Sequence, residues 1–350
     1  MAFIAISFFA SISPAVGQVC SQAVVVTTLN DSGAGSLRQA LLDICPDGTI
    51  SFDVSLADGT IDLISSLSIS QPVTIEASLP LTVSGQSVLR VMVLNASAAN
   101  QTVTVRGFTI ANSTSLNGSG INNSGFDLFL DDMNFVNNSA AEAGGAVFVQ
   151  DTITGTASLS VTNSIFNSNL ASNGGGIFAD TLGSVVVENG LFVDNEATSS
   201  GGGYSGSSAE FIDTRFVDNT GVSGGGLHVQ DGSLVSVSNA QFDSNQATRG
   251  GAVLVDDGLL EIVSTAIAFN AAENGGGIFV NAGGILSVES TTIYSNTATA
   301  GNGGGILVGF EAEALMANLT LSDNGADADG GNLYNDGSLS IANSILANSA

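Results

Sequence analysis

Short apolar runs recur along this chain with a fixed period, and the same polar residues separate them. From about residue 130 each unit has an apolar residue, two spacers, an asparagine and a small-residue turn that ends in a glycine pair or triplet. Eight asparagines share this place: Asn138, Asn169, Asn195, Asn219, Asn245, Asn270, Asn296 and Asn324. A ninth copy, with Ile345 and Asn348, follows them. Spacings of about 25 residues are typical of stacked repeats that bury apolar faces only against neighbouring units.

Each unit has three short apolar segments, as in residues 278–280, residues 285–288 and the segment that carries Ile293 ahead of Asn296. These segments are too short for helices and are rich in β-branched residues, so they predict strands. Three strands and three turns in about 25 residues predict one coil of an all-β parallel β-helix. About eleven or twelve coils, each adding about 4.8 Å, predict a rod roughly 50–60 Å long.

The repeated polar residues have a structural interpretation. Each repeated asparagine lies in a bend between two strands, where its amide can bond the asparagine one coil away. We therefore expect the eight asparagines to form a ladder along the rod. The glycine run that follows permits positive φ at another corner. These runs lack the lysine and the strand-loop-helix setting that a phosphate-binding loop requires.

Three segments divide the chain. Residues 1–17 carry an apolar run and small residues, which predicts a secretory signal peptide. Residues 18–48 are expected to cap the open end of the stack with an amphipathic helix, in which Ser36 caps the start. Its apolar stripe consists of Leu37, Ala40, Leu41 and Ile44. Residues 49–350 form the β-helix, with regular repeats from about 130.

Cys20 and Cys45 are the two cysteines of the chain. In an oxidising compartment they could form a disulfide that closes the N-terminal segment. The alternative is a pair of buried free thiols. A lone cysteine pair without a nearby histidine carries no zinc signature.

Charge narrows the choice of partners. The chain has 32 acidic residues against five Lys and Arg together, all of them arginine, and its formal net charge is -27. This charge repels nucleic acid and anionic membranes, so neither is expected as a partner. Two interpretations remain for the acidic surface: solubility of an exposed protein, or binding of a cation. No segment after the N-terminus has about 18 unbroken apolar residues, so no membrane insertion is expected.

The motifs Gly144-Gly-Ala-Val147 and Phe135-Val-Asn-Asn138 resemble the repeats of bacterial right-handed parallel β-helix surface proteins, and are similar to those of the polymorphic outer-membrane proteins. The resemblance implies a right-handed β-helix that is secreted or associated with the outer membrane at the cell surface. It implies an adhesin, passenger or stalk without enzymatic activity, with an extracellular glycan or protein as ligand. Such proteins usually end in an anchor, whereas Ala350 falls in mid-coil, so we expect the natural chain to continue.

A polysaccharide lyase or hydrolase on the same fold is the alternative, because this fold also serves carbohydrate enzymes. A lyase needs a base and acidic residues for calcium, and a hydrolase needs paired carboxylates. The single histidine, His228, is expected to be an ordinary outward-facing surface residue. Arg215 and Arg249 lie near coil turns, where pairing with Asp213 or Asp218 is expected.

The carboxylate candidates lie at turns and strand ends: Asp131, Asp132, Asp256, Asp257, Asp323, Asp327 and Asp329. Asp327 and Asp329 have a weak resemblance to a calcium loop, but they coincide with the glycine corner and are interpreted as a turn. The sequence therefore predicts no catalytic residue, no metal site and no cofactor, with calcium at Asp327 and Asp329 as the weak alternative.

Overall fold

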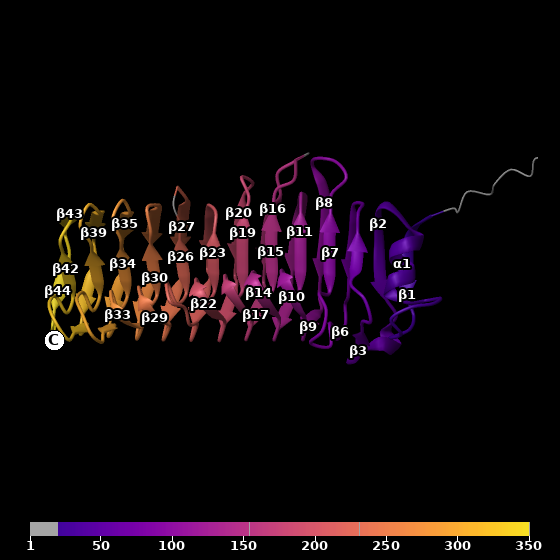
Figure 1. Cartoon of the computed structure of the whole chain (residues 1–350), viewed down its shortest axis with the longest axis horizontal. Helices are drawn as coiled ribbons and strands as arrows, with labels where there is room; N and C mark the ends of the chain where they lie inside the picture. The colour runs from indigo at the N-terminus through magenta and orange to yellow at the C-terminus, as the bar shows by residue number, and fades with distance from the viewer. Residues whose placement is uncertain (1–19, 154, 231, 350) are drawn as a thin grey trace, which may run out of the picture.

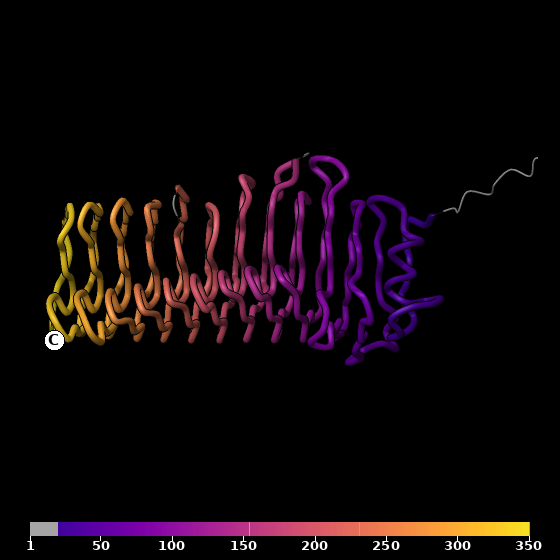
Figure 2. The backbone as a smooth tube through the Cα atoms, in the orientation of Figure 1, coloured from indigo at the N-terminus to yellow at the C-terminus, as the bar shows by residue number. Residues whose placement is uncertain are grey.

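The chain forms a parallel β-solenoid of about twelve turns, of the right-handed type (Figure 1). This computed structural model describes residues 20–153, 155–230 and 232–349. The signal-peptide prediction for residues 1–17 lies outside the described residues. All pairings between the named strands are parallel, and the coils follow one another along a straight rod from the N-terminal to the C-terminal end (Figure 2). The predicted all-β parallel β-helix is confirmed.

Three long sheets run the length of the rod, and we call them sheets A, B and C. Sheet A has thirteen strands: β1 (Ser21–Val26), β2 (Ile44–Phe52), β5 (Val73–Glu76), β8 (Gln101–Arg106), β12 (Phe126–Asp131), β16 (Ser158–Thr162), β20 (Val185–Glu188), β24 (Ala209–Ile212), β27 (Leu234–Ser238), β31 (Leu259–Val263), β35 (Ile285–Glu289), β39 (Glu313–Ala317) and β43 (Ser338–Ala342).

Sheet B has twelve strands: β3 (Gly59–Asp62), β6 (Leu81–Ser84), β9 (Thr109–Ala111), β13 (Asn134–Val136), β17 (Ile165–Asn167), β21 (Leu191–Val193), β25 (Arg215–Val217), β28 (Gln241–Asp243), β32 (Ala266–Ala268), β36 (Thr292–Tyr294), β40 (Thr320–Ser322) and β44 (Ile345–Ala347). Sheet C has eleven: β4 (Leu67–Ile69), β7 (Met92–Asn95), β11 (Ile121–Ser124), β15 (Val147–Gln150), β19 (Ile177–Asp180), β23 (Tyr204–Gly206), β26 (Leu227–Val229), β30 (Val253–Val255), β34 (Ile278–Val280), β38 (Ile306–Val308) and β42 (Leu333–Asn335).

A fourth, shorter face, which the sequence pattern did not predict, lies between sheets B and C. Its strands are β10 (Thr114–Asn117), β14 (Ser139–Ala143), β18 (Leu170–Asn173), β22 (Glu196–Ser200), β29 (Gln246–Arg249), β33 (Ala271–Asn274), β37 (Thr297–Ala298) and β41 (Gly325–Ala326). Isolated parallel bridges through Thr220 and Ser223 connect the two halves of this face. The segment between the asparagine and the glycine turn is short and rich in Ala, Ser and Thr, so it carries little strand signal.

The core consists of inward side chains stacked in columns along the rod. Phe135, Phe166, Phe192, Phe216 and Phe242 occupy equivalent positions of sheet B, and all are fully buried. Their ring centroids are 4.7–5.0 Å apart and the stacked rings are nearly parallel. Such stacking adds about 0.5–1.5 kcal/mol per pair beyond the area buried. The one-coil spacing of the strands thus coincides with a favourable ring spacing.

The N-terminal segment is not a helical cap. Its single α-helix, α1 (Leu37–Asp43), has seven residues, and a 3-10 turn, η1 (Val54–Leu56), follows β2. Strand β1 instead continues sheet A, because residues 23–26 pair with residues 49–52 of β2. The expected N-cap contact exists, since the Gln39 backbone N–H donates to Ser36 Oγ at 3.1 Å. Three residues of the apolar stripe lie in α1, and the fourth, Ile44, begins β2. With β1 paired to β2, the segment mainly extends the solenoid and does not form a separate cap.

The ninth repeat is shifted by one residue from the sequence-based assignment. Leu346, and not Ile345, pairs with Leu321 of the preceding coil. Asn348 has φ 48°, which is the conformation of the residue that precedes each ladder asparagine, such as Asp323. The assignment of Ile345 and Asn348 to the repeat was therefore wrong, because the spacing alone does not fix the strand register.

Candidate functional site

The eight repeated asparagines form a continuous chain of side-chain hydrogen bonds. From Asn138 to Asn324 each Nδ2 donates to the Oδ1 of the asparagine one coil further on, at 2.9 Å in all seven steps. The same Oδ1 accepts the backbone N–H of the preceding asparagine, at 2.9–3.1 Å. All eight residues are fully buried. Because these amides bond to each other and to the backbone, the ladder acts as internal scaffolding.

Both ends of the ladder use residues outside the repeated asparagine pattern. At the first end Ser113 Oγ donates to Asn138 Oδ1 at 2.6 Å. At the other end Asn324 Nδ2 donates to Asn332 Oδ1 at 2.9 Å, and Asn332 Nδ2 donates to the Ala347 carbonyl. Asn332 replaces the third glycine of the corner motif, and that replacement is the signal that could have identified it.

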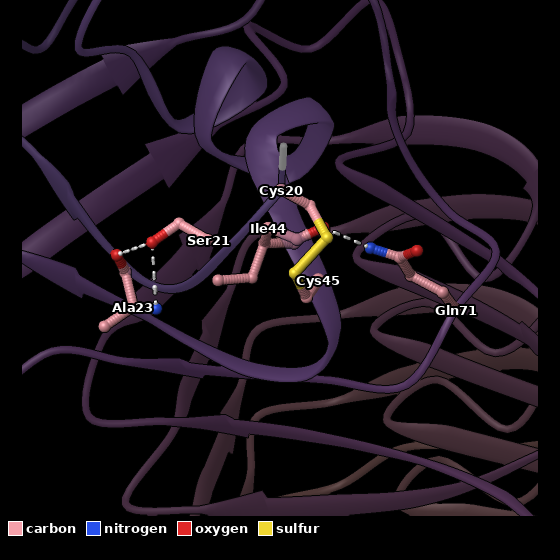
Figure 3. The surroundings of a disulfide bond; sticks show 6 residues. All are labelled: Cys20, Ser21, Ala23, Ile44, Cys45 and Gln71. Carbon is pink, nitrogen blue, oxygen red and sulfur yellow. Dashed lines mark hydrogen bonds between the residues drawn. A yellow bond between two sulfur atoms is a disulfide. The ribbon is translucent and has the colours of Figure 1, made fainter. Parts of the chain in front are cut away.

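A disulfide joins the start of the described chain to strand β2 (Figure 3). The Sγ atoms of Cys20 and Cys45 are 2.06 Å apart, across 25 residues of sequence. Beside it, Gln71 Nε2 donates to the Ile44 carbonyl at 2.9 Å. The bond therefore ties the residue before β1 to β2, the second strand of sheet A.

His228 was predicted to be an exposed surface residue because it lies at an outward position of its strand. This prediction was wrong, since only 7% of the residue is exposed. Its Nδ1 lies 3.4 Å from Ser205 Oγ, and its Nε2 lies 3.9 Å from the Asp256 carboxylate, which is beyond hydrogen-bond distance. Burial, and to a lesser extent Arg249, lowers the pKa of His228 to about 4, so the imidazole is neutral near pH 7. Ser205 is fully buried, and this row of Ser, His and Asp therefore presents no accessible nucleophile.

The outward row of sheet C is buried or half-buried, because the glycine corner folds back onto it. A Cβ built on Gly201 would lie 2.8 Å from Ser205 Cβ, and one built on Gly275 would lie 2.7 Å from Phe279 Cβ. Leu254, the register neighbour of His228, is likewise fully buried. Alternation along a strand therefore does not separate buried from exposed residues on this sheet.

Arg215 and Arg249 do not pair with the aspartates that the sequence predicted, so this prediction was wrong. Arg215 Nε donates to Gln241 Oε1 at 3.1 Å, and Arg249 Nη2 donates to Ser223 Oγ at 3.1 Å. No ion pair joins either arginine to Asp213 or Asp218 among the described residues. The ion pairs that do form with arginine are Arg38 with Asp31 and Arg106 with Glu76.

One carboxylate candidate, Asp131, lies with two other acidic residues at the corner between sheets A and B. Asp131, Glu188 and Asp213 line an open hollow of about 630 Å³. Hydrogen bonds from Thr162 Oγ1 and Asn163 Nδ2, at 2.7 and 3.0 Å, lower the pKa of Asp131. This carboxylate is therefore ionised near neutral pH and is not poised as an acid.

The calcium candidates Asp327 and Asp329 are both exposed. The Asp329 backbone N–H donates to Asn302 Oδ1, which places the pair in the glycine corner. Across residues 20–153, 155–230 and 232–349, no group of three or more His, Cys, Asp or Glu side chains is arranged to hold a metal ion.

The corner between sheets C and A contains a recess that the repeat pattern did not reveal. Two residues, Ser207 and Ser208, connect β23 to β24, whereas four connect β19 to β20 and four connect β26 to β27. The resulting step is visible along the edge of the rod beside β23 in Figure 1. A hollow of about 530 Å³ lies here, and we call it the corner notch. It is lined by Gln150, Asp151, Ala179, Asp180, Thr181, Leu182, Gly183, Ser207, Ser208, Gln230, Gly232 and Ser233.

Comparison with known proteins identifies no family. No family model matches the chain, and no curated protein matches it, so the polymorphic outer-membrane repeat family finds no support. In the described part of the chain no helix is long and apolar enough to cross a bilayer.

Solved structures resemble the chain at low identity. PfbA, a surface adhesin of Streptococcus pneumoniae, aligns over 93% of this chain and 92% of its own, at 12% identity and a TM-score of 0.47. The pectate lyase Pel9A aligns over 94% and 80%, at 11% identity and a TM-score of 0.43. A mannuronic acid specific family 6 polysaccharide lyase from human gut microbiota aligns over 87% and 81%, at 10% identity and a TM-score of 0.41.

Proposed function

We propose that this chain is a secreted or cell-surface β-helical rod without enzymatic activity, used as an adhesin, passenger or stalk. The observation that supports it best is the unbroken internal scaffold. The asparagine ladder and the stacked core columns hold the coils in one register over the whole regular part of the chain. A rod of this kind keeps its lateral surface in fixed geometry, which suits repeated weak contacts with an extracellular glycan or protein.

The disulfide and the charge agree with a location outside the cytoplasm. Disulfides persist in oxidising compartments, and Cys20–Cys45 lies just after the expected signal peptide. A net charge of -27 keeps such a rod soluble and apart from its copies. The association with an outer membrane is part of the proposal and rests on the repeat resemblance alone.

Mass spectrometry of the exported chain tests the location. We expect a chain that begins near Gln18 and is 2 Da lighter than the reduced form, because one disulfide removes two hydrogens. An exported chain that keeps Met1, or one with two free thiols, contradicts the proposal.

A turnover assay separates the rod from the polysaccharide lyase or hydrolase. The full chain is incubated with pectin, alginate and hyaluronan, with and without calcium, while unsaturated uronate and reducing ends are measured. We expect neither product above the rate without protein. Turnover that is lost in Asp131→Asn or Asp327→Asn overturns the non-enzymatic assignment.

A further inference from the structure

The corner notch is a built feature of one coil. Gly206 has φ 142°, and a Cβ placed on it would lie 2.2 Å from the Ala179 carbonyl oxygen, so this turn requires glycine. The Tyr204 hydroxyl donates to the Ser207 carbonyl at 2.8 Å from inside the core, and Ser233 Oγ donates to the Gly206 carbonyl at 3.1 Å. Burial raises the pKa of Tyr204, so its hydroxyl stays a donor. The hydrogen bonds from Tyr204 and Ser233 therefore fix the conformation of the short turn.

One wall of the notch is equally fixed. Asp151 accepts hydrogen bonds from the Ala157 and Leu182 amides, at 2.7 and 2.9 Å, and from the Thr181 hydroxyl. These bonds lower the pKa of Asp151 against the opposing effect of its burial. The Asp151 carboxylate therefore links its own turn to the neighbouring turn that contains Thr181 and Leu182. Leu182 projects from this wall with 91% of its surface exposed, and it forms an apolar lip.

The floor and the opposite wall carry unused or shared polar groups. Ser207 Oγ is buried at the base of the notch and has no hydrogen-bond partner in the protein. Gln230 Nε2 donates to Ser205 Oγ at 2.9 Å, and its side chain lines the hollow. Ser207 Oγ is closed off from solvent, so the side chains open to a ligand here are Ser208, which is exposed, and Gln230, which is half-buried.

The notch continues onto sheet A as a trough. A second hollow of about 460 Å³ shares Leu182, Gly183 and Ser208 with the first and reaches Glu210 and Glu261. Register pairs both glutamates with Ser236, one from each side, so they stand two rungs apart, or about 9.6 Å. The joined hollows are long enough for several linked sugar rings.

From this geometry we propose that the corner notch and its trough bind an uncharged oligosaccharide. This proposal deepens the surface-rod function and rests on it. Hydroxyl, amide and carboxylate groups beside an apolar lip match the alternating polar edges and apolar faces of sugar rings. The residues that line the two hollows include four carboxylates and no Lys, Arg or His, so a polyuronate meets only repulsion there. A cationic glycan would be attracted to the acidic rod in general and would gain little from this coil.

Calorimetric titration of the full chain tests the ligand class. The probes are cellohexaose, mannohexaose and N-acetylchitohexaose as neutral oligomers, hexagalacturonate as the anion and chitosan hexamer as the cation. We expect saturable binding of at least one neutral oligomer and no binding of hexagalacturonate. Binding of hexagalacturonate, or of the chitosan hexamer alone, overturns the neutral class.

Three variants locate the site. Ser208→Trp fills the notch and is expected to weaken the bound neutral oligomer at least tenfold, whereas Thr292→Trp, on exposed sheet B, leaves it unchanged. Leu182→Ala removes the 91% exposed lip without threatening the fold and is expected to weaken binding at least threefold. Glu210→Gln keeps the hydrogen-bond acceptor and is expected to change binding less than threefold. Loss of binding in Glu210→Gln alone contradicts an uncharged ligand.

The two proposals can fail separately. If every neutral oligomer fails to bind, or if Ser208→Trp and Leu182→Ala bind it as the parent does, the notch is not the site and the rod assignment stands. If a neutral oligomer binds and is cleaved, the notch assignment stands and the non-enzymatic rod is wrong.

Discussion

Asparagine suits the ladder position because its side chain uses both ends at once. Asn219 Oδ1 accepts from the Asn195 backbone and side chain, while its Nδ2 donates to the Phe192 carbonyl and to Asn245. Aspartate has no donor, and serine has a single hydroxyl hydrogen to donate. Ser113 can therefore begin the ladder but could not continue it.

Removing one rung should be costly. Asn219→Ala leaves the Asn195 backbone N–H, one Asn195 Nδ2 hydrogen and the Phe192 carbonyl without the Asn219 side chain in a fully buried site, whereas Asn245 Oδ1 keeps the backbone N–H of residue 219. We expect the free energy of unfolding to fall by about 3–5 kcal/mol, measured by denaturant titration. The control Asn335→Ala removes an exposed amide and should change it by less than about 0.5 kcal/mol. Similar effects of the two substitutions would show that the ladder does not stabilise the coils.

His228 should give the rod a pH dependence of known sign. Its folded pKa of about 4 lies below the usual value of 6.5, so between these limits the unfolded chain binds more protons. The contribution of the neutral imidazole to the free energy of unfolding is therefore fully present above pH 6.5. It is lost as the pH falls from 6.5 toward 4.

The sole histidine makes this contribution measurable by difference. The loss of unfolding free energy between pH 7 and pH 4.5 should be about 2 kcal/mol smaller in His228→Gln than in the parent, because the carboxylates titrate in both. Parallel pH profiles for the two proteins would show that the imidazole is solvated.

At the scale of one element, the turn after β23 should depend on its glycine. Gly206→Ala places a methyl group 2.2 Å from a backbone carbonyl, so the turn must lengthen or the coil must shift. We expect a loss of about 2–4 kcal/mol in unfolding free energy and weaker oligosaccharide binding. Gly232→Ala, at φ 71° with open space around it, should cost only about 1 kcal/mol. Equal costs would mean that the short turn is not under steric constraint.

The sequence predicted repeated elements well and single departures poorly. The apolar alternation that identified residues 285–288 as a strand reflects burial on one face, and the repeat multiplies that signal over many coils. The fourth face carries small residues with weak strand preference, as in Thr297–Ala298, and was missed. His228 was misplaced because its burial comes from the glycine corner folding onto sheet C, a contact between segments.

The corner notch could not be predicted because it is a difference between coils. Its recess exists only relative to the longer turns on either side, and Ser207 and Ser208 look like any other polar turn in the sequence. Tyr204 stands at the inward position that holds Ile177 and Leu227 in the adjacent coils, and this substitution marks the unusual coil. In a repeat protein, departures from the pattern are therefore where a site search should begin.

Across the whole molecule, parallel stacking repeats surface charges from coil to coil, as it repeats the core contacts. Equivalent residues stand one above another, so carboxylates in successive coils form rows. Desolvation raises the pKa of Asp218, and repulsion from Asp194 and Asp243 in the flanking coils raises it further. Repulsion within such a row of carboxylates destabilises the stacked coils, whereas the asparagine ladder and the core stabilise them.

Salt should therefore stabilise the rod. The Debye length falls from about 30 Å at 0.01 M to about 4 Å at 0.5 M ionic strength, which is less than the spacing of one coil. With a net charge of -27, we expect the unfolding midpoint at pH 7 to rise by about 3–6 °C over this range of sodium chloride. Asp218→Asn, which keeps a residue suited to the positive φ found there, should raise the midpoint at 0.01 M more than at 0.5 M. A midpoint that falls with salt would mean that ion pairs outweigh repulsion, and the two arginine pairs among the described residues are too few for that at pH 7.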